Sequence, residues 1–545
     1  MVCYLTDYSA NRIGFLVLSG NILTMLKKIF NSKRLICGLQ IPDWLFIAVG
    51  ITISAIITFW TITKSSIWFD EAFGAYMIKF NFADIARFTA SDVHPPLFYW
   101  LLKIWSMLFG NTELALRSMS VLFGGISIVF GYLLANRLFS QKVARISLIF
   151  MVLSPMLVRY SQEARMYTLI AAITLAATYV LTFAMTTKRR LPWVIYGILV
   201  ALGMWTHYFA AIVWVAHWIW RADVIRRIGG RKTFFKLFFS KQWILAHVIA
   251  VGIYLPWLPF FFWQTFSVTV LGFWIPAVNS STPLGFLTEF IYYKEPLETA
   301  GWQALGLWAA GIFLGVLAFK VYRNLNKAMQ QSYRLILTLA YLPMVILFVI
   351  STPPFRALYV DRYLITSAIG LALFIGVTLT LGYKSMRPLW RVIATVVIVA
   401  LLLTGIGNVW NLGNWNKNSK DTNQTREIVQ IAASKSTGKQ PIIAATPWIF
   451  YEAVFYSTDS NPVYFLNQSE YIIGSLEMLK DSDAHKIIDI SSFAKQHPIV
   501  WYIGYIRQGE LKAPYSNWKQ LQRYILKDTF SGNPEYEAIQ YNIAN

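Results

Sequence analysis

Residues 44–63 read WLFIAVGITISAIITFWTIT, and residues 64–77 directly after them read KSSIWFDEAFGAYM. The first stretch is uncharged and has the length of about twenty residues that a helix needs to cross a bilayer. The second places two adjacent carboxylates, Asp70 and Glu71, just beyond that predicted span. Similar apolar stretches recur, and we expect about eleven spans, at residues 44–63, 115–136, 144–159, 166–187, 192–207, 208–220, 242–263, 301–320, 334–351, 364–383 and 389–410.

The composition agrees with a membrane protein. Of the 545 residues, 56% are hydrophobic and 14% are charged, and the mean hydropathy is +0.49, whereas soluble proteins contain about a quarter charged residues. The formal net charge is +22, but most Lys and Arg lie in short loops, where they orient helices in a bilayer. Nucleic acid is therefore not expected as a partner. Both cysteines, Cys3 and Cys37, precede the first span, so no disulfide framework is predicted.

The loops differ in charge between the two sides of the predicted bundle. One side is basic, and by the positive-inside rule it is cytoplasmic, with Lys27, Lys28, Lys33, Arg34, Arg137, Lys142, Arg145, Lys188, Arg189, Arg190, Arg226, Arg227, Arg231, Lys232, Lys320, Arg323, Lys327, Lys384 and Arg387. The other side carries nearly all carboxylates, which are Asp70, Glu71, Asp84, Asp92, Glu113, Glu163, Glu289, Glu295, Glu298 and Asp361. The alternative is that these are ordinary solvated loop charges. This orientation requires residues 95–110 to lie in the interface as an amphipathic helix.

These patterns divide the chain into three parts. Residues 1–43 are expected to be a cytoplasmic segment, and residues 44–410 a helical membrane domain whose first outer loop is 64–114. Residues 411–545 are polar, with a predicted helix at 424–435 and buried strands at 441–446 and 498–505. We expect an all-α polytopic membrane domain followed by a small extracytoplasmic α/β domain that recognises an acceptor or caps the site. The protein is thus predicted to be a multi-pass protein of the cell (plasma or inner) membrane.

Asp70 and Glu71 are candidate catalytic residues. An acid at the membrane boundary is costly and often functional, and a carboxylate held near apolar groups can act as a general base. The alternative is that Asp70 only caps a helix that starts at Glu71, since Asp is a favoured N-cap.

The segment SDVHPPLFYW (91–100) presents Asp92 and His94 at the start of the predicted interfacial helix. Helix N-termini favour anions, so a phosphate is a candidate ligand here. A turn whose polar side chains only face water fits the pattern equally well.

A third outer cluster is SPMLVRYSQEARMYTL (154–169), which contains Glu163, Arg165 and Tyr167. A helix that begins near Ser161 would place Glu163 and Tyr167 on one face. Arginine beside aromatic residues at a membrane surface suits a phosphate or diphosphate. Tyr and Arg also populate the interface as simple lipid anchors.

Weaker signals lie on the same predicted face. Residues of each kind are more often structural than functional, and only their convergence on one side favours a binding site. They are His207 and Tyr208 in WTHYFA (205–210), Tyr293 and Lys294 in FIYYKEPLE (290–298), and Arg362 and Tyr363 in RALYVDRYL (356–364).

Taken in order, these motifs resemble the GT-C glycosyltransferases over residues 44–383. They are DE (70–71), DVHPPL, the Glu113–Arg117 segment, SQEARMY, THYF and DRYL. The likeness is to the family 39-like bacterial relatives of dolichyl-phosphate-mannose protein mannosyltransferases and of the lipid A aminoarabinose transferase. His94 stands where the aminoarabinose transferase has Lys, which favours the mannosyltransferase branch.

The resemblance implies a polyprenyl-phosphate sugar as donor and transfer on the extracytoplasmic face. It implies Asp70, rather than Glu71, as general base, and Arg165 and Arg362, supported by His94, at the departing phosphate. The acceptor is open between glycan, lipid and protein, because the C-terminal region does not resemble the repeat domain of eukaryotic mannosyltransferases. A divalent metal is compatible with the chemistry, although no ligand spacing predicts one.

Two other classes of function fit parts of the sequence. A transporter or lipid flippase would also place charged groups among many helices, but such proteins show internal repeats and mid-membrane charges, and neither pattern is found here. A receptor or scaffold that uses the C-terminal domain would leave the acidic and basic loops unexplained.

Overall fold

The computed structural model describes residues 35–36, 39–40, 42–271, 275, 277–279, 282–293, 301–412, 423–466, 474–506, 511–528 and 533–544. The predicted cytoplasmic segment 1–43 lies almost entirely outside the described residues, as do Cys3, Cys37 and Lys294.

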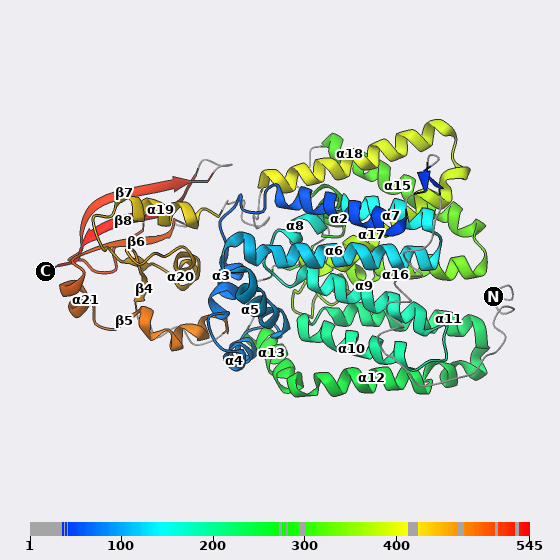
Figure 1. The fold of residues 1–545 in the computed structure, drawn as a ribbon, viewed down its shortest axis with the longest axis horizontal. Helices are drawn as coiled ribbons and strands as arrows, with labels where there is room; N and C mark the ends of the chain where they lie inside the picture. The colour runs from blue at the N-terminus through cyan, green and yellow to red at the C-terminus, as the bar shows by residue number, and fades with distance from the viewer. Residues whose placement is uncertain are drawn as a thin grey trace.

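Helices form the larger part of the molecule, and every predicted span contains at least one, although those in 144–159 are short (Figure 1). In chain order they are α2 (Asp43–Phe59), α6 (Glu113–Leu138), α7 (Gln141–Val152), α8 (Pro155–Ser161), α9 (Tyr167–Ala184), α10 (Leu191–Thr206), α11 (Ala210–Phe238), α12 (Lys241–Tyr254), α13 (Leu258–Leu271), α15 (Gly301–Asn324), α16 (Lys327–Val349), α17 (Ile365–Gly382) and α18 (Pro388–Leu412). Among the described residues, seven helices are long and apolar enough to cross a bilayer, or eight if one bent pair is a single span. The prediction of a polytopic helical membrane domain is confirmed.

The bent pair corresponds to the predicted span 144–159. The helix axis bends by 58° between its two parts, α7 and α8. Pro155 is the first residue of α8 and has no N–H for a continuous helix, and the Ser154 side chain caps α8 by accepting from the Leu157 N–H at 3.4 Å. The break turns the chain toward the candidate site instead of carrying it straight on.

Short elements precede or connect these helices. They are β1 (Leu35–Ile36), β2 (Leu39–Gln40), η1 (Leu255–Trp257), α14 (Thr282–Leu287), the π-helix η2 (Thr288–Tyr292), η4 (Asp361–Leu364) and η5 (Tyr383–Ser385).

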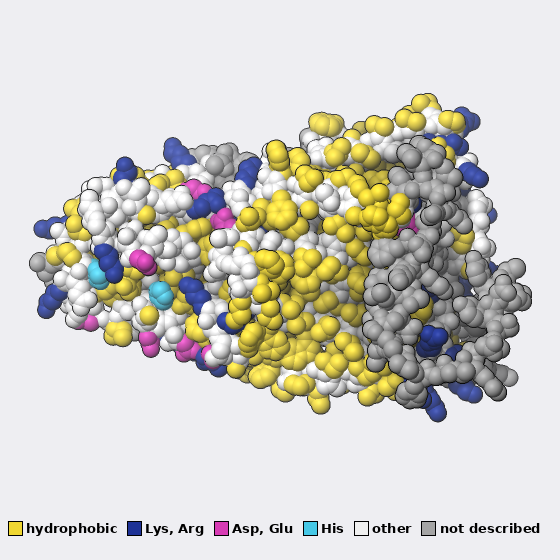
Figure 2. All heavy atoms as spheres, viewed as in Figure 1, with side chains coloured by type: hydrophobic (Ala, Val, Ile, Leu, Met, Phe, Trp, Pro, Cys, Tyr) yellow, Lys and Arg dark blue, Asp and Glu magenta, His cyan; other side chains and the backbone are white. Residues whose placement is uncertain are grey.

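The outside of the helical part is apolar. Hydrophobic side chains cover most of the described surface of this part in Figure 2, whereas charged side chains are scattered over the C-terminal part. Trp302 on α15 is 75% exposed and Val248 on α12 is 62% exposed. An apolar surface of this extent is typical of contact with lipid.

Glycines allow close packing inside the bundle, as in other membrane helices. A Cβ at Gly376 on α17 would lie 2.5 Å from the Ser147 Cα on α7. We expect Gly376→Ala to destabilise the detergent-purified protein by about 1–3 kcal/mol, because the backbones must move apart, and thermal unfolding measures this. Gly252→Ala on α12 is the matched control, since its Cβ would meet nothing within 4 Å; equal unfolding temperatures for the two variants would contradict this packing.

Three shorter helices lie between the long helices and the C-terminal domain (Figure 1): α3 (Phe69–Met77), α4 (Phe82–Ser91) and α5 (Leu97–Phe109). The α5 helix covers the predicted interfacial stretch 95–110. Its last residues, Met107, Leu108 and Phe109, are 58–70% exposed, whereas Phe98, Tyr99 and Leu102 are buried. This two-sided helix suits the membrane interface.

The C-terminal domain contains one mixed sheet with helices around it. Its elements are α19 (Thr425–Lys435), β3 (Ile442–Ala444), α20 (Pro447–Phe455), β4 (Val463–Leu466), η6 (Gly474–Asp481), η7 (Asp483–His485), β5 (Lys486–Ile487), α21 (Ile490–Gln496), β6 (Ile499–Tyr505), β7 (Lys519–Lys527) and β8 (Pro534–Asn542). The strand order is β5-β4-β3-β6-β8-β7, in which β5, β4, β3 and β6 are parallel and β8 pairs antiparallel with both β6 and β7. The predicted helix 424–435 and the two buried strands are confirmed.

Candidate active site

Glu71 lies in a buried ion pair with Arg117 of α6. Arg117 donates to both carboxylate oxygens, from Nε at 2.9 Å and from Nη2 at 2.7 Å, and both side chains are at most 1% exposed. Glu71 also accepts the Ala164 N–H at 2.7 Å. With its oxygens engaged from two sides, Glu71 ties α3 to α6 and to the loop before α9.

Asp70 is more accessible than Glu71, although the two are neighbours in sequence. Its side chain is 24% exposed, and its Oδ2 lies 3.8 Å from Nη2 of Arg165. The alternative that Asp70 caps a helix starting at Glu71 is wrong, because α3 starts at Phe69 with Trp68 as its N-cap. Asp70 is therefore inside the first turn, where a negative charge still interacts favourably with the helix N-terminus.

Arg165 is the cation that pairs with Asp70 among the described residues. It is 3% exposed and donates from Nη1 to the Tyr99 hydroxyl at 2.8 Å and to the Asp70 carbonyl at 3.3 Å. Burial alone would lower the pKa of Arg165, but Tyr99 and Asp70 raise it well above its ordinary value, so the guanidinium stays charged. Its Nε has no hydrogen-bond partner among the described residues.

The expected helix beginning near Ser161 is wrong. Helix α8 ends at Ser161, residues 162–166 form a turn, and α9 begins at Tyr167. Gln162 donates to the Thr58 carbonyl at 2.8 Å, and Ser120 donates to the Glu163 carbonyl at 2.6 Å. The Ser120 bond satisfies a turn carbonyl that a continuing helix would have satisfied internally, and the two bonds tie the turn to α2 and α6.

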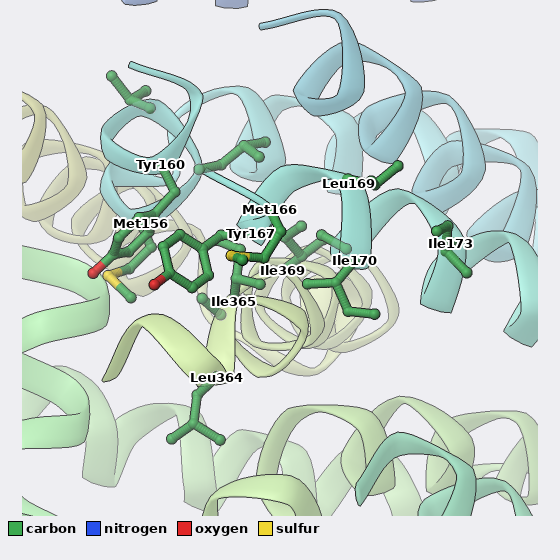
Figure 3. Packing of buried hydrophobic residues seen from close by; sticks show 14 of the residues in the cluster. Met156, Tyr160, Met166, Tyr167, Leu169, Ile170, Ile173, Leu364, Ile365 and Ile369 are labelled. Carbon is green, nitrogen blue, oxygen red and sulfur yellow. The ribbon is translucent and has the colours of Figure 1, made fainter. Parts of the chain in front are cut away.

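Glu163 belongs to a second buried cluster. It forms an ion pair with Arg159 at 3.1 Å, and Arg159 donates from Nε to the Tyr293 hydroxyl at 2.8 Å. Burial raises the pKa of Glu163 above its ordinary value, and Arg159 opposes this rise. Figure 3 shows Tyr160 beside Tyr167, with ring centres 5.1 Å apart, so this cluster adjoins the aromatic residues of the site.

An aromatic cluster surrounds the second candidate cation, Arg362. Its guanidinium carbon lies 5.7 Å from the centre of the Trp68 ring and 5.9 Å from that of Tyr363, distances at which a cation is attracted to a ring face. The Tyr363 ring lies 4.9 Å from His207, and Tyr167 lies within 6.5 Å of both.

His94 and His207 meet at the other side of this cluster. Their ring centres are 5.5 Å apart, and His94 Nδ1 lies 3.3 Å from the Asp92 carboxylate. His207 is 6% exposed, and its Nδ1 accepts the Phe209 N–H at 3.2 Å, so the neutral ring carries its proton on Nε2. That Nε2 is buried without a partner among the described residues.

A cavity of about 560 Å³ opens beside these two histidines. His94, His207 and Tyr363 line one part of it, and Arg356 lines another. The remaining wall is mainly apolar and includes side chains of α11, α13 and residues 350–358. Tyr208 lies on this wall, where its hydroxyl donates to Gln264 and accepts from Trp257 Nε1 at 2.8 Å.

The described candidates form several contacting groups. Asp70 meets Arg165, and Asp92, His94, His207, Tyr167, Tyr363 and Arg362 follow one another through ring, hydrogen-bond and cation–ring contacts. Tyr208 lies on the cavity wall, and Glu71, Glu163 and Tyr293 belong to two separate buried clusters. Lys294 lies outside the described residues. Tyr99 and Trp68 were missed as site residues, and Arg117 was noted only as part of a motif; the three touch Arg165, Arg362 and Glu71 respectively. The described part of the chain contains no group of three His, Cys, Asp or Glu that could hold a metal ion.

The chain is similar in sequence and in fold to known proteins. The family model of dolichyl-phosphate-mannose-protein mannosyltransferase matches residues 93–260. An undecaprenyl phosphate-alpha-4-amino-4-deoxy-L-arabinose arabinosyl transferase of Pseudomonas savastanoi pv. phaseolicola is 27% identical over 174 residues, which are 30% of either chain. The match to this curated relative therefore spans less than a third of its length. The family model is thus named for a mannosyltransferase, and the curated relative is named as an arabinosyl transferase.

Solved structures share the fold over nearly the whole chain. ArnT from Cupriavidus metallidurans in the apo state has a TM-score of 0.57 at 13% identity, covering 91% of this chain and 97% of that one. The same protein bound to undecaprenyl phosphate gives a TM-score of 0.56, with the same identity and coverage. The resemblance of this chain to the GT-C superfamily of glycosyltransferases is thereby confirmed, by the family model in the middle of the chain and by the shared fold over most of it.

Proposed function

We propose that this protein is an integral-membrane glycosyltransferase that moves a sugar from a polyprenyl-phosphate donor to an envelope acceptor on the extracytoplasmic face. Asp70 takes the proton of the acceptor hydroxyl, and the acceptor oxygen attacks the anomeric carbon. The bond from that carbon to the phosphate oxygen breaks, and polyprenyl phosphate leaves with the electron pair. Attack opposite the departing phosphate inverts the configuration. The acceptor is a glycan, lipid or protein of the envelope.

The observation that carries this proposal is the partly accessible carboxylate of Asp70 beside the buried cation Arg165. Glu71 is held between Arg117 and Ala164, which leaves Asp70 as the acid of the DE pair that can meet an acceptor hydroxyl. Arg165 and Arg362 provide positive charge where the departing phosphate gains negative charge. The buried Nε2 of His207 is a further donor for that phosphate.

The cavity supports a lipid carrier as the donor. Its apolar wall suits a polyprenyl chain, and its histidine end lies next to the cluster of Tyr363 and Arg362. The ArnT structure with undecaprenyl phosphate shows that a protein of this fold binds such a carrier. Orientation with the N-terminus in the cytoplasm and the C-terminal domain outside, in the cell (plasma or inner) membrane, follows from the basic loops.

The proposal is tested by product release. Purified protein in detergent is incubated with undecaprenyl-phosphate mannose or undecaprenyl-phosphate 4-amino-4-deoxy-L-arabinose and an envelope extract, and free undecaprenyl phosphate is measured. Release that depends on the extract supports transfer. Movement of the intact donor across vesicles without release would instead support the flippase alternative.

Arg165→Lys is expected to weaken donor binding about tenfold, because lysine cannot reproduce the planar fork of arginine at a phosphate. Binding of undecaprenyl phosphate and the KM values for donor and acceptor measure this. Arg137→Lys is the control, since Arg137 bonds Thr182 and Thr186 on the opposite, basic side. Equal losses toward donor and acceptor would assign Arg165 a role in folding.

A further inference from the structure

The segment that leads into Asp70 runs through residues 65–68 and has no helical hydrogen bonds of its own before α3. Its backbone groups are satisfied from two directions. From the membrane domain, Arg117 donates to the Ser65 carbonyl at 3.0 Å and to the Ser66 carbonyl at 3.1 Å. From the C-terminal domain, Asn423 accepts the Ser66 N–H at 3.2 Å with its carbonyl and donates to the Ile67 carbonyl at 3.1 Å with its side chain.

Tyr456 of the C-terminal domain holds a further backbone group of this segment. Its hydroxyl accepts the Ile67 N–H at 2.6 Å and donates to Glu113 at the start of α6. Arg426 donates to the same Glu113 carboxylate at 2.8 Å. One hydroxyl therefore fixes the chain three residues before Asp70 and links it to the membrane domain.

Asn423 is itself fixed by the C-terminal domain. Its side-chain oxygen accepts from the Thr425 N–H at 3.1 Å and from the Tyr536 hydroxyl at 3.1 Å. Its side-chain nitrogen also lies 3.3 Å from Glu452 of α20. The position of the Ile67 carbonyl is thus set by the folded domain and not by a free side chain.

Helix α3 also packs along α20 of the C-terminal domain. Phe69 lies 4.7 Å from Trp448 and Phe73 lies 5.9 Å from Tyr451, as ring centres. At the far end of α3, the Tyr76 hydroxyl donates to Ser482 at 2.7 Å. The helix that carries Asp70 is therefore held by the C-terminal domain at its start, along one face and near its end.

From these contacts we infer that the C-terminal domain completes the active site, and that Asn423 and Tyr456 are positioning residues that set the orientation of Asp70. This rests on the proposed function. The domain acts on the base through the backbone of residues 66–67. This backbone is bonded by Arg117 from the membrane domain and by Asn423 and Tyr456 from the C-terminal domain. An acceptor hydroxyl meets a carboxylate whose direction depends on both domains.

The effect on turnover follows from geometry. Removing the Tyr456 hydroxyl leaves the Ile67 N–H without its partner, so the start of α3 gains freedom. Misplacement of a reacting group by about 1 Å costs on the order of 100-fold in rate. The donor site contacts Arg165, Arg362 and His207 instead, so donor binding is not expected to change.

The experiment compares full-length Tyr456→Phe and Asn423→Ala with Tyr464→Phe. Tyr464 lies in the same domain, where its ring packs against Phe493 and His497. We expect kcat to fall about 10–100-fold in the first two variants, with unchanged KM for donor and unchanged binding of undecaprenyl phosphate, and no change in Tyr464→Phe. All values are taken per folded protein, measured by size-exclusion chromatography and thermal unfolding.

Each outcome bears on the inference. Wild-type kcat in both Tyr456→Phe and Asn423→Ala would overturn it, as would a loss of donor binding equal to the loss of kcat, which indicates general unfolding. Asn423→Gln keeps the amide and is expected to recover part of the activity lost in Asn423→Ala. No product release by the wild-type protein would instead overturn the proposed function, so the two failures are distinguishable.

Discussion

Asp70→Asn is expected to reduce kcat by about three orders of magnitude, because a positioned general base contributes about 10²–10⁴-fold to rate. Asparagine has nearly the same shape and preserves the first turn of α3, but it cannot accept a proton from the acceptor hydroxyl. Binding of undecaprenyl phosphate should remain, since the donor headgroup meets Arg165 and Arg362. Release of undecaprenyl phosphate from a labelled donor measures the turnover.

Two further variants make this result specific. Asp84→Asn changes an acid of the same outer loop that pairs with Asn81 and Arg87 on the surface, and it should leave kcat unchanged. Glu71→Gln should lower the yield of folded protein, because Glu71 neutralises buried Arg117. Full activity of Asp70→Asn would remove Asp70 from the mechanism, and a loss of donor binding equal to the loss of rate would make its role electrostatic.

The helical architecture could be predicted from the sequence because membrane spans are encoded locally. An uncharged stretch such as 44–63 must form a helix in lipid, where backbone groups cannot bond to water, and α2 covers most of it. The break in 144–159 and the turn at 162–166 were not predicted. The break has a local cause, Pro155 after the capping Ser154, which span length and hydropathy do not register. The turn at 162–166 depends on bonds to distant residues, such as Gln162 to Thr58, and hydropathy carries no signal for these.

The residues of the candidate site could be gathered from their motifs, but their individual contacts could not be predicted. Adjacent acids at 70 and 71 look alike in sequence. Their environments differ because Arg117, 46 positions away, pairs with Glu71 and not with Asp70. The link from Ile67 to Tyr456 spans 389 positions, so the contribution of the C-terminal domain is visible only in three dimensions.

Arg117→Met is expected to destabilise the protein by about 3–5 kcal/mol, the typical cost of leaving one partner of a buried ion pair alone. Arg117 also donates to the carbonyls of Ile62, Ser65 and Ser66, so its loss leaves these groups without their donor as well. Thermal unfolding of detergent-purified protein, followed by tryptophan fluorescence, measures the change. Arg137→Met is the control, because Arg137 is exposed and hydrogen-bonds threonine groups instead of pairing with a buried carboxylate.

The double variant Glu71→Gln/Arg117→Met separates the charge effect from the packing effect. When both charges are removed, no unpaired carboxylate is left buried, so the double variant should unfold at a higher temperature than Arg117→Met alone. Recovery should remain partial, because the carbonyls of residues 62, 65 and 66 still lack a donor. An Arg117→Met protein that unfolds at the wild-type temperature would contradict the buried pair, and a double variant no more stable than Arg117→Met would assign the whole effect to the carbonyl bonds. Because those carbonyls belong to the segment before Asp70, we expect the double variant to fold and yet to transfer sugar more slowly than the wild type.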